Sequence, residues 1–106
     1  MDLNQNGLDD TMSLLRKVDA NIKGLSIIAN TAKEGDVDDS IAKTVGTFGR
    51  IDHCVNAAGI AGAVGGIEEI ELNEYERLMD VNLKGVWLCE RAQIRQFLKQ
   101  KMRPVE

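Results

Sequence analysis

The stretch Ile51-Asp52-His53-Cys54-Val55-Asn56-Ala57-Ala58-Gly59 decides the fold class. It is a short apolar run that ends in an asparagine, two small residues and a glycine, which is typical of a buried strand at its carboxyl end. In an open α/β sheet, ligands bind at that end, and small residues let a cofactor approach the backbone closely. Asn56 offers amide hydrogens and an acceptor oxygen there. An ordinary strand end without a ligand is the alternative interpretation.

Helices are predicted on both sides of a second short strand. Apolar residues at helical spacing predict an amphipathic helix over residues 7–20, and a β-rich run predicts a strand over residues 25–30. The next helix is expected to begin with Asp36 or Asp38 as its N-cap and to end near Gly49. Together with the flanking segments this gives helix, strand, helix, strand, helix, the alternation of a parallel α/β sheet in one domain, residues 1–106.

The longest predicted helix covers residues 74–99. Asn73, with Glu76 three residues later, has the spacing of a capping box. Apolar residues extend around most of the circumference, which predicts cover from two sides, by a sheet and by a neighbouring helix or subunit. We therefore expect a homo-oligomer or aggregate through this helix. Asn82, near its middle, is a poor helix former, and we expect it to be buried with its amide hydrogen-bonded. An asparagine that simply bonds a nearby backbone group is the alternative interpretation.

Composition excludes several classes of function. A formal net charge of -4 gives no attraction to nucleic acid or to an anionic membrane. No apolar run is long enough to span a bilayer and the start does not resemble a signal peptide, so a cytoplasmic location is expected.

Cys54 and Cys89 lack metal or disulfide spacing and are interpreted as small core residues. The acidic cluster in residues 34–39 does not fit a calcium loop, so no metal site is expected. The glycine-rich residues 59–66 predict a mobile loop.

The opening stretch and Asp80-Val81-Asn82-Leu83-Lys84-Gly85 together resemble the short-chain dehydrogenase/reductase family. In that family Gly-Arg-Ile-Asp precedes Asn-Asn-Ala-Gly at the end of strand four, and the next helix carries Val-Asn-x-x-Gly. Ala57 replaces the second asparagine. The resemblance implies a partial Rossmann-like, doubly wound parallel sheet. It also implies NAD(P)-dependent interconversion of small-molecule alcohols and ketones. The matching residues are Gly49, Arg50, Ile51, Asp52, Asn56, Ala58, Gly59, Val81, Asn82 and Gly85.

The resemblance implies cofactor contacts at the adenosine end. Asp2 would end strand two and accept hydrogen bonds from the adenosine ribose hydroxyls. This favours NAD, with NADP possible, because a carboxylate repels a 2′-phosphate. Asn30 and Thr31 occupy the place of the Asp-Val pair that contacts the adenine ring in the family.

The resemblance also implies contacts at the reacting end. Asn56, Ala58 and Gly59 would lie beside the nicotinamide and its ribose. Asn82 would be the asparagine of the catalytic tetrad, which holds a water molecule in a proton relay behind the catalytic lysine.

Two family motifs are not found in these 106 residues. The first is the glycine-rich turn that binds pyrophosphate, and the second is Tyr-x-x-x-Lys, because Met79 stands four residues after Tyr75. We therefore expect a central fragment of the family domain, inactive as an isolated chain. The family strand order 3-2-1-4-5-6 predicts that residues 25–30 and 51–56 are not neighbours. The alternatives are a non-catalytic protein that pairs through residues 74–99 with a full-length relative, and a structural remnant without activity.

Overall fold

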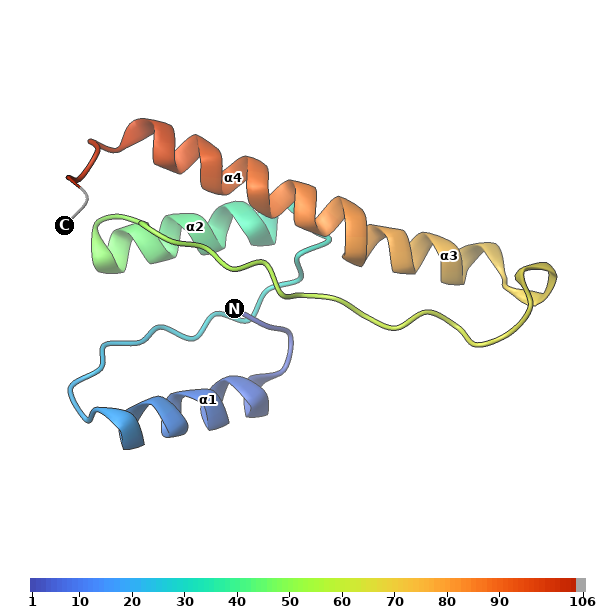
Figure 1. Cartoon of the computed structure of the whole chain (residues 1–106), viewed down its shortest axis with the longest axis horizontal. Coiled ribbons are helices and arrows are strands. Elements are labelled where there is room, and N and C mark those ends of the chain that lie inside the picture. Colours follow the sequence, from blue (N-terminus) through green and yellow to red (C-terminus); the bar gives the residue numbers. More distant parts are fainter. Residues whose placement is uncertain (105–106) are drawn as a thin grey trace.

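The computed structural model describes residues 1–104 and consists of helices joined by long extended segments (Figure 1). A π-helical turn, Asp80–Lys84, joins α3 to α4 into one continuous helix, in which Gly85 N donates to Asp80 O. This long helix and α2 lie side by side, while α1 lies on the other side of the extended segments. The helices are α1 (Gln5–Val18), α2 (Glu34–Phe48), α3 (Leu72–Met79) and α4 (Gly85–Lys99), with a 3₁₀ turn at Ile67–Glu69.

The first two helices form, but their starts differ from the prediction. Helix α1 begins earlier than expected because the Asn4 side chain accepts a hydrogen bond from Gly7 N at 3.0 Å. Helix α2 follows Lys33, so neither Asp36 nor Asp38 is its N-cap. The Asp36 carboxylate instead accepts from Asn30 N at 2.8 Å and fixes the turn before the helix. The end at Gly49 is confirmed, with a φ of 85° that favours glycine.

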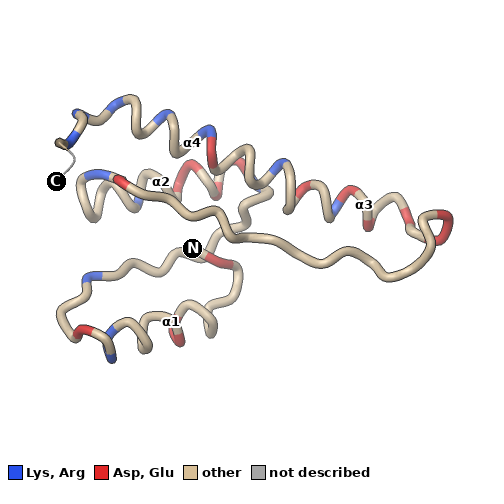
Figure 2. The backbone as a smooth tube through the Cα atoms, viewed as in Figure 1, with Lys and Arg blue, Asp and Glu red and all other residues tan. Residues whose placement is uncertain are grey.

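The long helix begins at Leu72 rather than at residue 74. Glu71 O accepts from Glu74 N at 3.1 Å and from Tyr75 N at 3.3 Å, so Asn73 lies inside the helix. The predicted capping box is therefore wrong, and the end at Lys99 is as expected. Acidic residues are frequent at the start of this helix and basic residues toward its end (Figure 2), a distribution that suits the helix dipole.

The two predicted strands do not form a sheet within residues 1–104. In the first, Ile28 makes one parallel bridge with Asp2, where Asp2 N donates to Ile27 O at 3.1 Å and Ala29 N to Asp2 O at 3.0 Å. Residues 51–56 are extended, and in the described chain no backbone hydrogen bond joins them to another segment. The two segments are therefore not paired, as the family strand order implies, and their edges stay open.

A side chain, rather than a strand, holds the start of the second extended segment. Gln100 Oε1 accepts from Ile51 N at 2.8 Å, and Gln100 Nε2 donates to Ile51 O at 2.7 Å. Next to it Arg50 donates to Asp52 at 2.8 Å, and this hydrogen bond lowers the pKa of the Asp52 carboxyl. The end of α4 thus supplies the hydrogen bonds that a neighbouring strand would otherwise make.

The core lies between α2 and α4. Val37 is only 2% exposed and packs with Leu88, Cys89 and Ala92, with Ile41 at the edge of the cluster. This packing positions the face of α4 that borders the extended segments.

An ion pair on the outside joins the same two helices. Arg91 contacts Glu34 at 2.7 Å, and its guanidinium lies 4.4 Å from the centre of the Trp87 ring. Because the pair is largely exposed, we assign the main stability to the apolar cluster.

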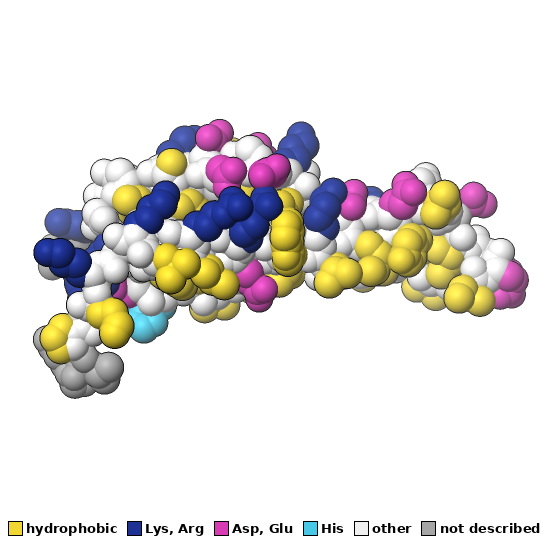
Figure 3. Space-filling view, turned by 90° about the horizontal axis from the view of Figure 1, so that it is seen from above, with side chains coloured by type: hydrophobic (Ala, Val, Ile, Leu, Met, Phe, Trp, Pro, Cys, Tyr) yellow, Lys and Arg dark blue, Asp and Glu magenta, His cyan; other side chains and the backbone are white. Residues whose placement is uncertain are grey.

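The long helix contacts α2 on one side and the extended segment of residues 51–60 on another, and the cover by a further helix or subunit is not seen in residues 1–104. Helix α2 covers the face that carries Leu88 and Ala92. A second row of apolar residues, spaced by four and seven, remains exposed. Figure 3 views the molecule from above this helix and shows hydrophobic side chains among the charged ones. We call this row the outer face, formed by Leu83, Trp87, Ile94 and Leu98. No helix in residues 1–104 has the length and apolar character needed to cross a membrane.

Candidate functional site

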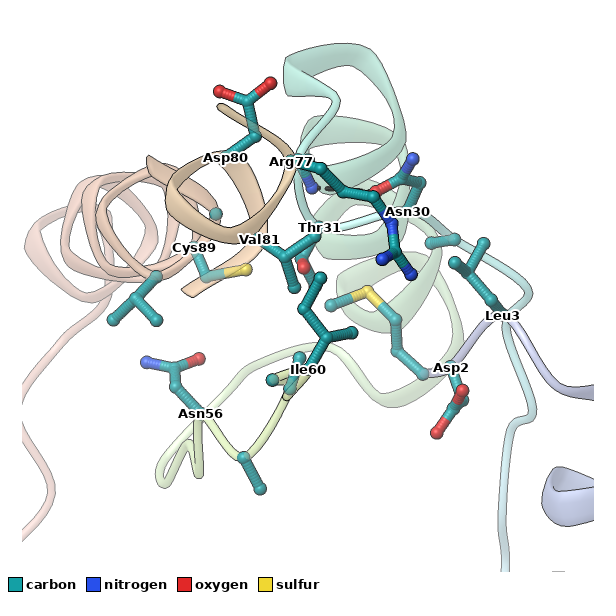
Figure 4. Close-up of a pocket in the computed structure, with 18 of the residues that line it drawn as sticks. Asp2, Leu3, Asn30, Thr31, Asn56, Ile60, Arg77, Asp80, Val81 and Cys89 are labelled. Carbon is teal, nitrogen blue, oxygen red and sulfur yellow. Dashed lines mark hydrogen bonds between the residues drawn. The ribbon is translucent and has the colours of Figure 1, made fainter. Parts of the chain in front are cut away.

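One cavity of about 860 Å³ is lined by all six residues predicted to bind a cofactor. Its walls come from residues 1–3, residues 29–32, residues 54–60 and one side of the long helix. Figure 4 shows Asn56 across the cavity from Asp2, with Ile60 between them. Side chains far apart in the sequence therefore meet at the ends of the two extended segments, where an open α/β sheet binds ligands.

The bridge to Ile28 positions Asp2 at one end of the cavity. Its backbone is fixed on both sides by that contact, and its carboxylate accepts from Asn4 N at 3.1 Å. One carboxylate oxygen is thus used locally, which leaves the other for hydroxyl donors. Asp2, Glu76 and Asp80 line the cavity with a single basic residue, Arg77. The Asp80 carboxylate points away from the cavity (Figure 4) and pairs with Lys84 at 3.0 Å, so Asp2, Glu76 and Arg77 are the charged side chains that remain in the wall.

Asn30 and Thr31 form a tight turn that packs against the start of α4. Asn30 Oδ1 accepts from Ala32 N at 2.9 Å, and Asn30 O accepts from Lys33 N at 3.0 Å. A Cβ at Gly85 would lie 3.1 Å from Thr31 Oγ1 and 3.2 Å from Thr31 O, which is tighter than an ordinary contact. Glycine at this place in the helix lets the turn approach closely.

Asn56 forms a reciprocal pair with a glutamine of α4. Asn56 Nδ2 donates to Gln93 Oε1 at 3.0 Å, and Gln93 Nε2 donates to Asn56 Oδ1 at 2.7 Å. Both side chains line the cavity. Each amide keeps one hydrogen and one lone pair beyond this pair, which a ligand can use.

Asn82 lies behind the cavity wall and contacts the cavity through Ile60. Its Oδ1 accepts from Ile60 N at 2.9 Å and its Nδ2 donates to Ile60 O at 2.8 Å. Contrary to expectation Asn82 is exposed, but its amide is satisfied. Ala58 and Gly59 line the cavity just before this contact, and a Cβ at Gly59 would lie 3.4 Å from Asn82 Oδ1. Asn82 therefore holds the loop that follows Ala58 and Gly59, two of the predicted cofactor contacts.

Both cysteines line the cavity, although only one is a core residue. Cys89 is buried as expected, whereas Cys54 is exposed, because no strand covers the extended segment. Partial burial raises the pKa of each thiol. Both thiols are therefore neutral near pH 7 and poor nucleophiles. Among residues 1–104 no group of three or more histidine, cysteine or acidic side chains is arranged to hold a metal ion.

The sequence prediction missed Gln93 and Gln100, which hold the extended segment. A signal for them existed, because they lie 11 and 18 residues after Asn82, close to whole numbers of helical turns. Asparagine or glutamine at such spacing on one helix face indicates a line of amides that can hold an extended backbone. The role of Gly85 in admitting Thr31 was not predicted either.

Sequence comparison identifies relatives over most of the chain. A family model described as enoyl-(acyl carrier protein) reductase matches residues 1–105. A 2-(R)-hydroxypropyl-CoM dehydrogenase of Xanthobacter autotrophicus is 39% identical over 80 residues, which are 74% of this chain and 32% of the relative. An uncharacterised oxidoreductase of Thermotoga maritima is 33% identical over 99 residues, which are 93% of this chain and 38% of the relative. The chain spans about a third of the length of such curated relatives.

Solved structures agree with this assignment. A levodione reductase superposes with a TM-score of 0.90 at 26% identity, over 92% of this chain and 38% of the other. An NAD⁺-bound xylitol dehydrogenase gives a TM-score of 0.86 at 23% identity, over 92% of this chain and 37% of the other, and shows the fold alone. The segments therefore hold an α/β arrangement even where few sheet hydrogen bonds are present. The chain belongs to the short-chain dehydrogenase/reductase family.

Proposed function

We propose that this chain supplies the central part of a nicotinamide-dinucleotide site in an oxidoreductase that interconverts small-molecule alcohols and ketones. The observation that carries the proposal is the shared cavity. It is lined by all six residues that the family resemblance assigns to cofactor contacts, from three separate segments. These residues are Asp2, Asn30, Thr31, Asn56, Ala58 and Gly59.

The chemistry of the walls supports an orientation for the cofactor. The adenosine would lie at Asp2 and the turn of Asn30 and Thr31, and the nicotinamide ribose would lie at Asn56 and Gly59. The Asp2 carboxylate accepts hydrogen bonds from ribose hydroxyls and repels a 2′-phosphate, so we propose NAD rather than NADP. The nicotinamide ring, when bound, gives or accepts the hydride.

Asn82 has a proposed role at the catalytic end. In the family resemblance it belongs to the proton relay, and here its side-chain amide is occupied by Ile60. The side chain of Asn82 therefore holds the loop at residue 60, and we propose that it fixes this loop beside the relay.

We expect NAD to bind this chain weakly, because its cavity offers contacts for the two nucleoside ends and the known pyrophosphate motif is not among these residues. Calorimetric titration should give a dissociation constant above roughly 10 μM, about 7 kcal/mol of binding free energy. NADP should bind more weakly still, and Asp2→Asn should reduce this difference. Asp10→Asn, on α1 and outside the cavity wall, is the matched control. A preference for NADP in the unaltered chain would contradict the assigned role of Asp2.

We expect a chain of these 106 residues to give no turnover. A positioned acid or base contributes about 10²- to 10⁴-fold to a proton transfer, and Tyr75, with Met79 four residues later, cannot play the family role. The absorbance of reduced cofactor, followed with a panel of alcohols and ketones, is the measurement. Turnover by the unaltered chain that disappears in Asn82→Ala would contradict this expectation. It would show that this site is active and that a residue other than Tyr75 supplies the proton.

A second function is favoured by the outer face of the long helix. Leu83 is 60% exposed, and the three apolar residues that share its face are also accessible. Exposed apolar rows of this kind mark protein interaction sites. We therefore keep, as the alternative, a non-catalytic protein that pairs through this helix with a full-length relative or with a second copy.

A further inference from the structure

The Asn56 and Gln93 pair carries an inference about how the site is built. The two amides exchange both possible hydrogen bonds, at 3.0 and 2.7 Å, although 37 residues separate them. Asn56 itself is exposed, and its stretch of backbone makes no backbone hydrogen bond to another segment within residues 1–104. Without a neighbour, an exposed asparagine on an open segment rotates among several rotamers.

We propose that Gln93 is a positioning residue, which fixes the plane of the Asn56 carboxamide toward the cavity. The inference rests on the proposed function, because it assigns to Gln93 the preparation of a cofactor contact. Gln93 need not touch the reacting atoms. Its role is to remove the rotational freedom of Asn56 before a ligand arrives, so that this cost is not paid on binding.

The helix makes Gln93 a rigid support. Ala92, its neighbour in sequence, and Cys89, one turn earlier, are both buried in the cluster with α2. The Cα of Gln93 is therefore held by core packing, whereas the Cα of Asn56 is held by side chains alone. The amide pair therefore lets the rigid helix fix the position of Asn56 in the extended segment.

Two further amides, Asn82 in the long helix and Gln100 directly after its end, hold the segment at its two ends. Gln100 binds Ile51 through both backbone groups, and Asn82 binds Ile60 in the same way. The segment thus runs antiparallel to the helix: residue 51 lies beside residue 100, residue 56 beside residue 93 and residue 60 beside residue 82. Of the three contacts, only the one at Gln93 ends on a side chain that lines the cavity and not on backbone. Gln93 therefore orients a side chain that can contact a ligand, whereas Gln100 and Asn82 hold the backbone of the segment in place.

The pair also limits the kind of group that Asn56 can bind. After the exchange with Gln93, the carboxamide of Asn56 keeps one hydrogen and one lone pair in a fixed plane. A neutral group that both donates and accepts, such as a ribose hydroxyl or a carboxamide, matches this arrangement. A phosphate, which only accepts, would use half of it.

The test replaces Gln93 by methionine, which keeps the length of the side chain and removes both hydrogen bonds. We expect the Asn56 side-chain amide hydrogens to exchange about two- to tenfold faster by nuclear magnetic resonance, since the modest hydrogen bond that Asn56 Nδ2 donates is lost. The dissociation constant for NAD should rise by a similar factor. Gln93→Glu keeps an acceptor for Asn56 Nδ2 and should give intermediate values.

Gln96→Met is the matched control, because Gln96 lies one turn away and does not line the cavity, and within residues 1–104 its side chain bonds only Gln100. It should leave both readouts unchanged. Unchanged Asn56 exchange in Gln93→Met would overturn the proposal, as would faster exchange with unaltered NAD affinity. If the unaltered chain does not bind NAD, the proposed function fails, and the exchange measurement still decides whether Gln93 holds Asn56. Should Gln93→Met fail to fold, as judged by its melting curve, Gln93→Leu, which also removes both hydrogen bonds, decides by the same two readouts.

Discussion

Replacement of Leu88 by alanine is expected to destabilise this chain by about 2–5 kcal/mol, the cost of removing a buried leucine side chain from a packed core. Leu88 is 7% exposed and belongs to the single cluster between α2 and α4. Small domains have a total unfolding free energy of about 5–15 kcal/mol, so this loss is a large share of it. Urea denaturation followed by far-ultraviolet circular dichroism measures the change.

Leu83→Ala is the control for this prediction. It makes the same substitution in the same long helix, at an exposed position, and should change the stability by less than about 0.5 kcal/mol. Equal losses in the two variants would contradict the assignment of the main packing of the helix to the cluster with α2.

Charges on the outer face are expected to weaken self-association. Ile94 and Leu98 are 54% and 81% exposed and lie one turn apart on α4. We predict that the double variant Ile94→Glu with Leu98→Glu raises the dissociation constant of any dimer by at least about tenfold, or 1.4 kcal/mol. The reason is that burying a single large apolar side chain contributes about 1.5–3 kcal/mol. Sedimentation at several protein concentrations is the measurement.

A pair on α1 provides the matched control. Leu14 and Val18 are 61% and 83% exposed and also lie one turn apart, so Leu14→Glu with Val18→Glu adds the same charge outside the long helix. It should leave the association unchanged. A monomeric unaltered chain with a cooperative melt would remove the main support for the interaction-protein alternative.

Helices were predictable from the sequence because their signals are local. The apolar spacing in the three helical stretches and the glycine at residue 49 specify helices and one helix end without reference to the rest of the chain. The starts were less well predicted. Asp36 has the chemistry of an N-cap, yet its carboxylate binds Asn30 N, a contact set by the turn before the helix.

Strands were not predictable in the same way, because a strand requires a partner. The composition of residues 51–56 indicates an extended conformation, which is present, but the pairing depends on segments elsewhere. Cys54 illustrates the consequence, since it would be a core residue beneath a sheet and is exposed on an open segment.

The residues predicted to contact a cofactor line one cavity, while the residues that hold its walls together were not foreseen. Asp2, Asn30 and Asn56 could be placed near one another from the motifs alone, because the ends of parallel segments meet at one edge of a sheet. In the structure all three line the same cavity. Gln93 and Gln100 belong to no motif that we used. Their importance depends on the antiparallel course of the extended segment along the helix, which the sequence alone does not show.

The measurement that tests the central claim most directly is a map of backbone amide shifts on addition of NAD, recorded by nuclear magnetic resonance. The account predicts that the shifts concentrate in residues 1–3, residues 29–32 and residues 54–60, and that they spare the exposed side of α1. Shifts confined to the outer face of the long helix, or scattered without relation to the cavity, would contradict the assignment of this cavity as the dinucleotide site.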